Sequence, residues 1–187
     1  MVKDTVSPDN IEELVATRRW VLEGHVTMDP EQGVHFSVVW RVDEGTTVRF
    51  TEDNRVEERY FVVTGDDWRS IEDVMADIRS GTDIWSLDDL ILEFDGNVYP
   101  AGKAEATLRL GVGSPLTVVD PIKDRIITAA RNRETRVRRG ALWAMAYSAW
   151  PEYLDPILRL ADGDPDERIA HEAAVILRNL SEEGGNR

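Results

Sequence analysis

The sequence predicts an α+β protein, with an antiparallel β-sheet in its first part and only helices in its last part. Between residues 18 and 64, apolar and polar residues alternate with a period of two, which is typical of half-buried strands. From residue 120 onward, apolar residues instead follow the spacing of helices, and one helix–turn–helix pattern occurs twice. We place the division between two domains, 1–115 and 116–187, at the Gly/Pro-containing segment 111–115.

The strands expected between residues 18 and 64 form a meander. The clearest is Val34–Val42, in which every second residue is apolar, and it follows a strand over Trp20–Met28. The loop 29–33 joins the two and is rich in turn-forming residues. Two further hairpin turns, at Glu44-Gly45 and Asp53-Asn54, are flanked by strands expected at Thr47–Phe50 and Val56–Thr64.

One helix is expected to cover this sheet. Asp66 or Asp67 is a suitable N-cap, an apolar stripe at helical spacing follows over Trp68–Arg79, and Gly81 is placed to end the helix. A shorter helix, capped by Ser7, is expected before the first strand. Two more strands are expected at Leu90–Phe94 and Ala104–Leu110, separated by the turn-forming segment 95–97.

The last third of the chain contains a repeated pair of helices. The four helices are expected at about Pro121–Asn132, Glu134–Trp150, Glu152–Ala161 and Pro165–Leu180. Asp120-Pro121-Ile122 opens the first pair, and Asp155-Pro156-Ile157 opens the second pair 35 residues later. A fixed period of about 20–50 residues is typical of stacked helical repeats, which often present a surface to a partner.

Residues 120–180 resemble HEAT-like repeats, the helical hairpins of α-solenoid proteins. The resemblance is carried by the leucine-rich helix and Asp-Pro-Asp turn in Pro156–Asp166, and by two matching second helices at Val137–Met145 and Arg168–Leu177. It implies a scaffold or protein-docking surface and brings no catalytic residues. The first copy has Arg133-Glu134-Thr135 in place of the Asp-Pro-Asp turn. Because at least three repeats are usually needed for a stable stack, we expect the sheet domain or a second chain to cover one open end.

The charge of the chain is distributed unevenly. Residues 1–118 contain 11 Lys/Arg and 24 Asp/Glu, a net charge of −13, whereas residues 119–187 contain 11 and 12, a net charge of −1. An acidic surface attracts basic partners and repels nucleic acid and anionic membranes. We therefore expect a partner protein with a basic surface, although an acidic surface is also a common means of staying soluble.

Several classes of chemistry are not indicated. The chain has no cysteine, which excludes disulfides, thiol nucleophiles and cysteine–zinc sites. It contains no run of about 18 apolar residues and no apolar core of the signal-peptide type, so we expect a cytoplasmic protein without a membrane span. We find no phosphate-binding glycine loop and no nucleophile elbow, and so expect no enzyme, no cofactor and no metal.

The candidate binding residues lie on the second helix of the first repeat. A helical wheel places Val137, Ala141, Ala144 and Met145 on one side. The opposite side carries Arg136, Arg139, Trp143, Tyr147 and Trp150, which we call the aromatic–arginine stripe. Large aromatic residues and arginine are frequent interface anchors. The alternative is that this side packs inside the protein, against the sheet domain or the preceding helix.

An arginine cluster and a pair of histidines could also form binding sites, but each has a simpler explanation. Five arginines between residues 131 and 139 resemble a nucleic-acid footprint, but we expect them to pair with carboxylates of the sheet domain or of their own helix. His25 and His35 are expected to lie diagonally across the first hairpin, where they either form part of a metal site or are simply exposed.

The sequence therefore predicts a protein-binding adaptor without enzymatic activity. A specific version is an immunity- or antitoxin-type inhibitor, whose acidic surface would cover a basic site on a toxin. One alternative is an enzyme or small-ligand protein with a pocket between sheet and helices. Another is a homo-oligomer held together through the aromatic–arginine stripe.

Overall fold

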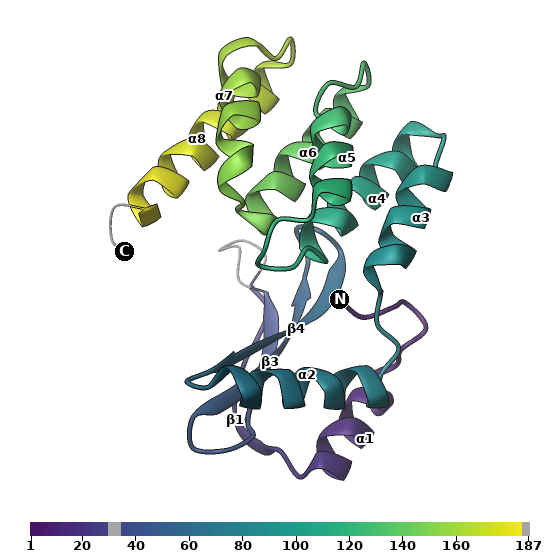
Figure 1. Cartoon of the computed structure of the whole chain (residues 1–187), viewed down its shortest axis with the longest axis vertical. Coiled ribbons are helices and arrows are strands. Elements are labelled where there is room, and N and C mark those ends of the chain that lie inside the picture. Colours follow the sequence, from purple (N-terminus) through teal and green to yellow (C-terminus); the bar gives the residue numbers. More distant parts are fainter. Residues whose placement is uncertain (30–34, 185–187) are drawn as a thin grey trace. The chain divides into compact units, whose positions relative to one another are not determined.

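The computed structural model describes residues 1–29 and 35–184, and their side chains up to residue 180. Contacts between residues divide the chain into two units, Met1–Trp85 and Ser86–Arg187, which we call the sheet unit and the helical unit (Figure 1). The first contains a four-stranded antiparallel sheet and the second only helices. The predicted α+β class is thus confirmed.

The sheet unit follows the expected meander. Its elements are α1 (Pro8–Arg18), β1 (Val21–Val26), β2 (Phe36–Arg41), β3 (Thr46–Asp53), β4 (Glu58–Gly65) and α2 (Trp68–Gly81). The strands lie in the order β1-β2-β3-β4, so each pairs with its neighbour in sequence. The two hairpin turns predicted after β2 and β3 are confirmed. The predicted loop between the first two strands lies mostly outside the described residues, which resume at His35.

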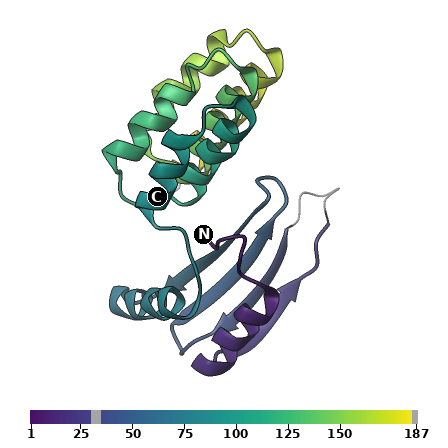
Figure 2. The same ribbon diagram turned by 90° about the vertical axis from the view of Figure 1, so that its right-hand side faces the viewer.

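Both helices of the sheet unit pack on one face of the sheet (Figure 2). Each begins at the expected cap, since the side chains of Ser7 and Asp67 accept hydrogen bonds from backbone N–H groups of the first turn. The core of this face consists chiefly of Ile11 and Leu14 of α1, Val74 and Ile78 of α2, and Trp40, Val48 and Phe50 of the sheet. Because alternate strand residues point to opposite faces, Val39 and Arg49 lie on the other face, which no described helix of this unit covers.

The helical unit consists of three consecutive helical hairpins within the described residues. They are α3 (Leu87–Gly96) with α4 (Pro100–Val112), α5 (Asp120–Ala129) with α6 (Thr135–Ser148), and α7 (Leu154–Gly163) with α8 (Glu167–Gly184). A short 3₁₀ turn, Pro151–Tyr153, precedes α7. The second helices pack side by side, α4 against α6 and α6 against α8. The four helices predicted after residue 120 are confirmed.

The two strands predicted at Leu90–Phe94 and Ala104–Leu110 are wrong, because both segments are helical. Ser86 and Asp89 form a capping box at the start of α3, and Pro100 occupies the first turn of α4. Short apolar runs do not distinguish a strand from a buried helix. As a result, the division between the units falls between Trp85 and Ser86, whereas the sequence prediction placed it between residues 115 and 116.

The first hairpin supplies the cover that the predicted pair of hairpins needs on one side. Helix α4 packs on α6 through small residues, and the contact is closest at two glycines. A Cβ atom on Gly111 would lie 2.3 Å from the Cα atom of Ala144, and one on Gly140 would lie 2.7 Å from the carbonyl oxygen of Ala104. The sequence around α4 therefore fits a close helix–helix crossing.

Candidate protein-binding site

Helix α6 carries most of the aromatic–arginine stripe. Its apolar side is fully buried in the helical unit, as the helical wheel predicted for Ala141, Ala144 and Met145. On the opposite side, Arg136 and Arg139 are exposed, and Trp143 and Tyr147 are half-buried. Four of the five predicted residues thus keep some accessible surface on one side of one helix.

A carboxylate of the next hairpin fixes two of these side chains. Glu172 of α8 accepts hydrogen bonds from Arg139 Nη2 at 2.8 Å, from Arg139 Nε at 2.9 Å and from Trp143 Nε1 at 3.2 Å. The hydrogen bonds to Glu172 raise the pKa of Arg139 above its ordinary value. Arg139 and Trp143 are therefore held in one orientation next to each other, at the seam between α6 and α8.

Trp150 does not belong to this surface. It is only 3% exposed, its Nε1 atom donates a hydrogen bond to the carbonyl oxygen of Pro115 at 2.9 Å, and its ring stacks on Tyr153. Helix α6 ends at Ser148, so the wheel was extended too far. Pro151 is the feature of the sequence that indicates this earlier helix end, because the residue before a proline is disfavoured in the helical conformation.

Arg138 is a key residue of this region that the stripe did not include. It is buried, and its guanidinium forms a two-pronged ion pair with Asp164 in the loop between α7 and α8, at 2.7 and 2.9 Å. The same guanidinium donates to the carbonyl oxygens of Asn132 and Arg133 at 3.0 Å. The helical wheel already indicates that Arg138 is buried, since it places Arg138 next to Met145 on the apolar side of the helix.

Among the described residues, the arginines of the 131–139 cluster pair only partly in the expected way. Arg138 and Arg139 bind carboxylates of the following hairpin, Asp164 and Glu172, and not those of the sheet domain or of their own helix. Arg133 lies 3.3 Å from the neighbouring Glu134. With the residues that the structure describes, Arg131 and Arg136 form no ion pair. Part of the cluster thus joins two hairpins, and part of it remains available to a partner.

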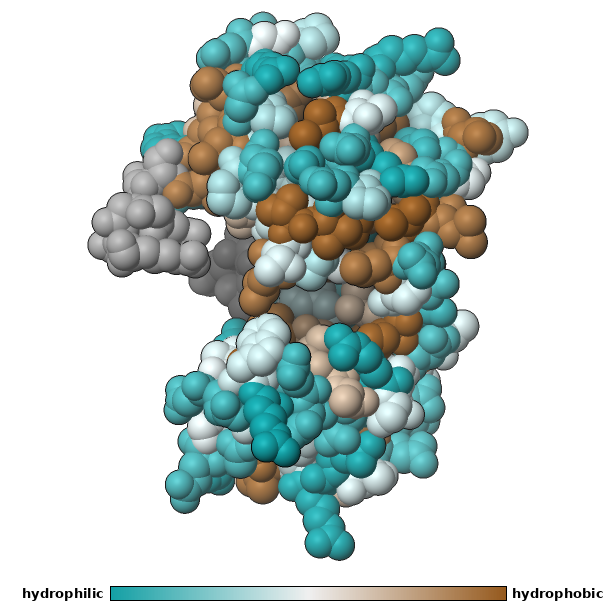
Figure 3. Space-filling model, in the orientation of Figure 1, coloured by the Kyte–Doolittle hydropathy of each residue, from teal (hydrophilic) through white to brown (hydrophobic). Residues whose placement is uncertain are grey.

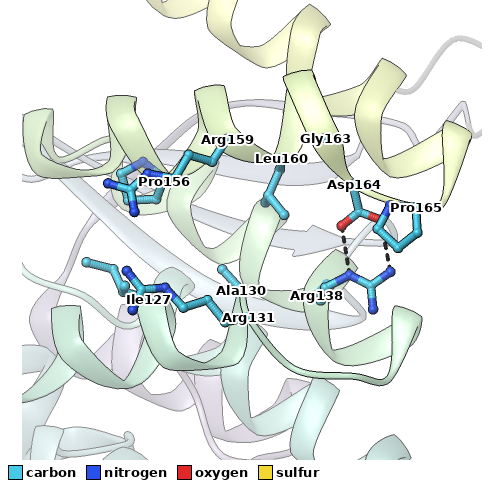
Figure 4. Close-up of a pocket in the computed structure, with 10 residues that line it drawn as sticks. All are labelled: Ile127, Ala130, Arg131, Arg138, Pro156, Arg159, Leu160, Gly163, Asp164 and Pro165. Carbon is cyan, nitrogen blue, oxygen red and sulfur yellow. Dashed lines mark hydrogen bonds and ion pairs between the residues drawn. The ribbon is translucent and has the colours of Figure 1, made fainter.

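A shallow hollow lies between the first helices of two hairpins, α5 and α7 (Figure 4). Leu160 points from α7 toward Ala130, which follows the last residue of α5, and the ion pair between Arg138 and Asp164 closes one end. The hollow has a volume of about 220 Å³. Pockets for small molecules usually have about 300–1,000 Å³. This hollow is better suited to a single side chain of a partner protein.

Apolar side chains are also exposed on the helical unit. Leu154 and Leu158 lie one turn apart on α7 and are 45% and 46% exposed. Figure 3 shows further apolar side chains among hydrophilic ones on one face of the unit. Scattered apolar residues are normal on a surface, so they add contact area to the site without defining it.

The histidine pair expected in the first hairpin is not formed. His25 pairs with Val38, whose side chain packs toward the covered face of the sheet, whereas His35 lines a hollow on the open face. In residues 1–29 and 35–180, no three His, Asp or Glu side chains are close enough to share a metal ion. Within the same ranges, no helix has the length and apolar character that crossing a membrane requires.

The candidate site therefore consists of Arg136, Arg139, Trp143 and Tyr147 on α6 together with Glu172 on α8, with the hollow between α5 and α7 elsewhere on the same unit. A comparison of the chain with protein-family models, with curated proteins and with solved structures found no match.

Proposed function

We propose that the protein is an adaptor that binds another protein through the α6–α8 seam of its helical unit, without catalysing a reaction. The observation that carries this proposal is the arrangement of Arg139 and Trp143 around Glu172. Arginine and tryptophan are enriched among the residues that contribute most to binding. Because Glu172 already holds both side chains, less conformational entropy is lost when a partner binds.

The neighbouring residues support the same use of this surface. Arg136 is exposed and forms no ion pair with the described residues, so its charge is available to a partner. Tyr147 extends the aromatic–arginine stripe one turn further along α6 and is half-buried. HEAT-like repeats, which residues 120–180 resemble, are commonly used as docking surfaces of this kind.

We propose that the partner has a basic surface. The sheet unit contains 9 Lys/Arg and 19 Asp/Glu, a net charge of −10. Many of these carboxylates are exposed on its two helices, including Asp9, Glu12 and Glu13 on α1 and Glu72 and Asp73 on α2. Such a surface speeds the encounter with a basic protein and disfavours nucleic acid. An immunity- or antitoxin-type inhibitor is the specific form of this proposal.

The test compares two substitutions that reverse the same charge on different units. Arg136→Glu changes an exposed side chain of the proposed site, and Arg69→Glu changes an exposed side chain of α2 as a matched control. Each tagged full-length chain is expressed in its native host, and its stoichiometric partner is identified and then titrated in purified form. Arg136→Glu should weaken binding about tenfold or more, because it removes the hydrogen bond that Arg136 would donate to a carboxylate or carbonyl group of the partner, and the control should bind like wild type.

Two results would overturn the proposal. One is the absence of any stoichiometric partner of the wild-type chain. The other is equal affinity of Arg136→Glu and wild type for the partner that is found. A dimeric mass in light scattering that is lost in Arg136→Glu would instead assign the seam to a homo-oligomer.

A further inference from the structure

The open face of the sheet presents a regular grid of side chains with an arginine at its centre. Strand pairing aligns β2, β3 and β4 in three rows: Ser37–Thr51–Tyr60, Val39–Arg49–Val62 and Arg41–Thr47–Thr64. Arg49 lies in the middle row of the middle strand, with a valine on each side. Each of the outer rows contributes hydroxyl groups, and none of the nine residues is acidic.

Arg49 has no acidic partner among the residues that the structure describes. The other arginine of the grid, Arg41, lies 3.2 Å from Glu23 of β1. The nearby buried carboxylate of Asp53 is already engaged: it accepts hydrogen bonds from Tyr60 Oη at 3.1 Å and from the Arg55 N–H at 2.9 Å. It also lies 3.3 Å from His35 Nδ1. Arg49 is thus a cation without an ion pair to any described residue, in a unit with a net charge of −10.

The side chains of the grid line a hollow that is large enough for a small ligand. The hollow has a volume of about 450 Å³, within the usual range of about 300–1,000 Å³ for small-molecule pockets. Its lining consists of five hydroxyl-bearing residues, three valines, Arg49 and His35. Burial and the neighbouring Asp53 raise the pKa of Tyr60, so its hydroxyl remains protonated and stays fixed on that carboxylate.

We propose that this face binds a small organic anion that carries a phosphate or carboxylate group. A guanidinium matches both groups with paired N–H donors. The hydroxyls of Thr47 and Thr64, which are accessible, would act as donors and acceptors for the polar part of the ligand, and Val39 and Val62 would contact its carbon atoms. This site lies in the sheet unit and does not depend on the protein-binding function of the helical unit.

The experiment is an NMR titration of the full-length, ¹⁵N-labelled chain at constant ionic strength. The probes are inorganic phosphate, glycerol 3-phosphate and glutarate, which separate a phosphate ligand from a carboxylate ligand. We expect saturable shifts at the amides of the grid and at Arg49 Nε. The organic probes should bind more tightly than inorganic phosphate, because only they reach the valines and the hydroxyl groups.

Variants make this test specific. Arg49→Gln should weaken binding of the preferred probe about tenfold or more, since a charge-assisted hydrogen bond is lost, and Arg49→Lys should retain part of the affinity. Arg69→Gln, an exposed arginine of the same unit, serves as the matched control and should bind like wild type. Arg49 is exposed and forms no ion pair with the described residues, so these variants should keep the fold. Absence of saturable shifts with all three probes, or unchanged binding by Arg49→Gln, would overturn the proposal.

Discussion

Arg138 links the second and third hairpins through a buried ion pair. Its guanidinium binds both oxygens of Asp164 and two backbone carbonyl oxygens, so one side chain satisfies four acceptors. Burial by itself raises the pKa of Asp164, but the hydrogen bonds from Arg138 and from the Asp166 N–H together lower it by more than burial raises it. The pKa of Asp164 therefore lies below its ordinary value. The ion pair is thus retained at neutral pH.

Replacing Arg138 should destabilise the helical unit strongly. Arg138→Met leaves Asp164 buried without its cation, and the removal of one partner from a buried pair typically costs about 3–5 kcal/mol. The free energy of unfolding, measured by urea denaturation at pH 7, should fall by this amount. Arg159→Met, which removes an exposed ion pair with Asp155 on α7, should change the stability little.

Measuring the free energy of unfolding at acidic pH tests whether the ion pair causes this loss of stability. A carboxylate with a lowered pKa stabilises the fold above its unfolded pKa of about 3.9, and this contribution is lost as the pH falls below that value. The difference between wild type and Arg138→Met should therefore narrow in acid. A constant difference from pH 7 to pH 3 would show that the ion pair is not its cause.

At the scale of elements, the contact between α4 and α6 explains why the α3–α4 hairpin belongs to the helical unit. The facing residues are small, and Gly111 and Gly140 lie where the two helices are closest. A strand interpretation of 104–110 fails because Ala104, Thr107 and Gly111 share one side of a helix and bury it on α6. Apolar content alone did not reveal this, since the residues involved are mostly small rather than strongly apolar.

Adding one methyl group at this contact should be destabilising. In Gly111→Ala, the new Cβ atom would lie 2.3 Å from the Cα atom and 2.4 Å from the carbonyl oxygen of Ala144, so the helices would have to separate. Overpacking of this kind typically costs about 1–3 kcal/mol. Gly96→Ala, at the end of α3, is the control because its Cβ atom would meet no other atom within 4 Å. A melting temperature of Gly111→Ala equal to that of the control would contradict the close contact.

At the scale of the whole molecule, the chain contains two units with separate cores. The core of the sheet unit lies between its helices and one face of its sheet, and that of the helical unit contains buried residues of all three hairpins. Most of the acidity lies in the sheet unit, because the helical unit has 13 Lys/Arg and 17 Asp/Glu. Protein binding is proposed for one unit and anion binding for the other.

The helical unit should fold on its own when residues 86–187 are expressed alone. Three hairpins reach the number that stacked repeats usually need, whereas residues 120–187 contain only two. By circular dichroism, the longer fragment should be helical and melt cooperatively, and the shorter one should have much less helix. Equal stability of both fragments would show that the α3–α4 hairpin is not required.

The sequence alone determined the features that depend on local periodicity and capping. The strand meander after Trp20, the caps at Ser7 and Asp67 and the four helices after residue 120 all follow from spacings within one element. It also identified α6 as a helix with one buried side and a second side rich in arginine and aromatic residues.

Only the tertiary structure decided which residues meet across elements. It paired Arg138 with Asp164, and Glu172 with Arg139 and Trp143, and it showed that Trp150 is buried. It also made residues 87–112 the first of three helical hairpins. It also aligned three strands so that Arg49 lies between Val39 and Val62, with rows that carry hydroxyl groups on either side. These outcomes depend on contacts between residues far apart in the chain, and periodicity within one segment contains no information about them.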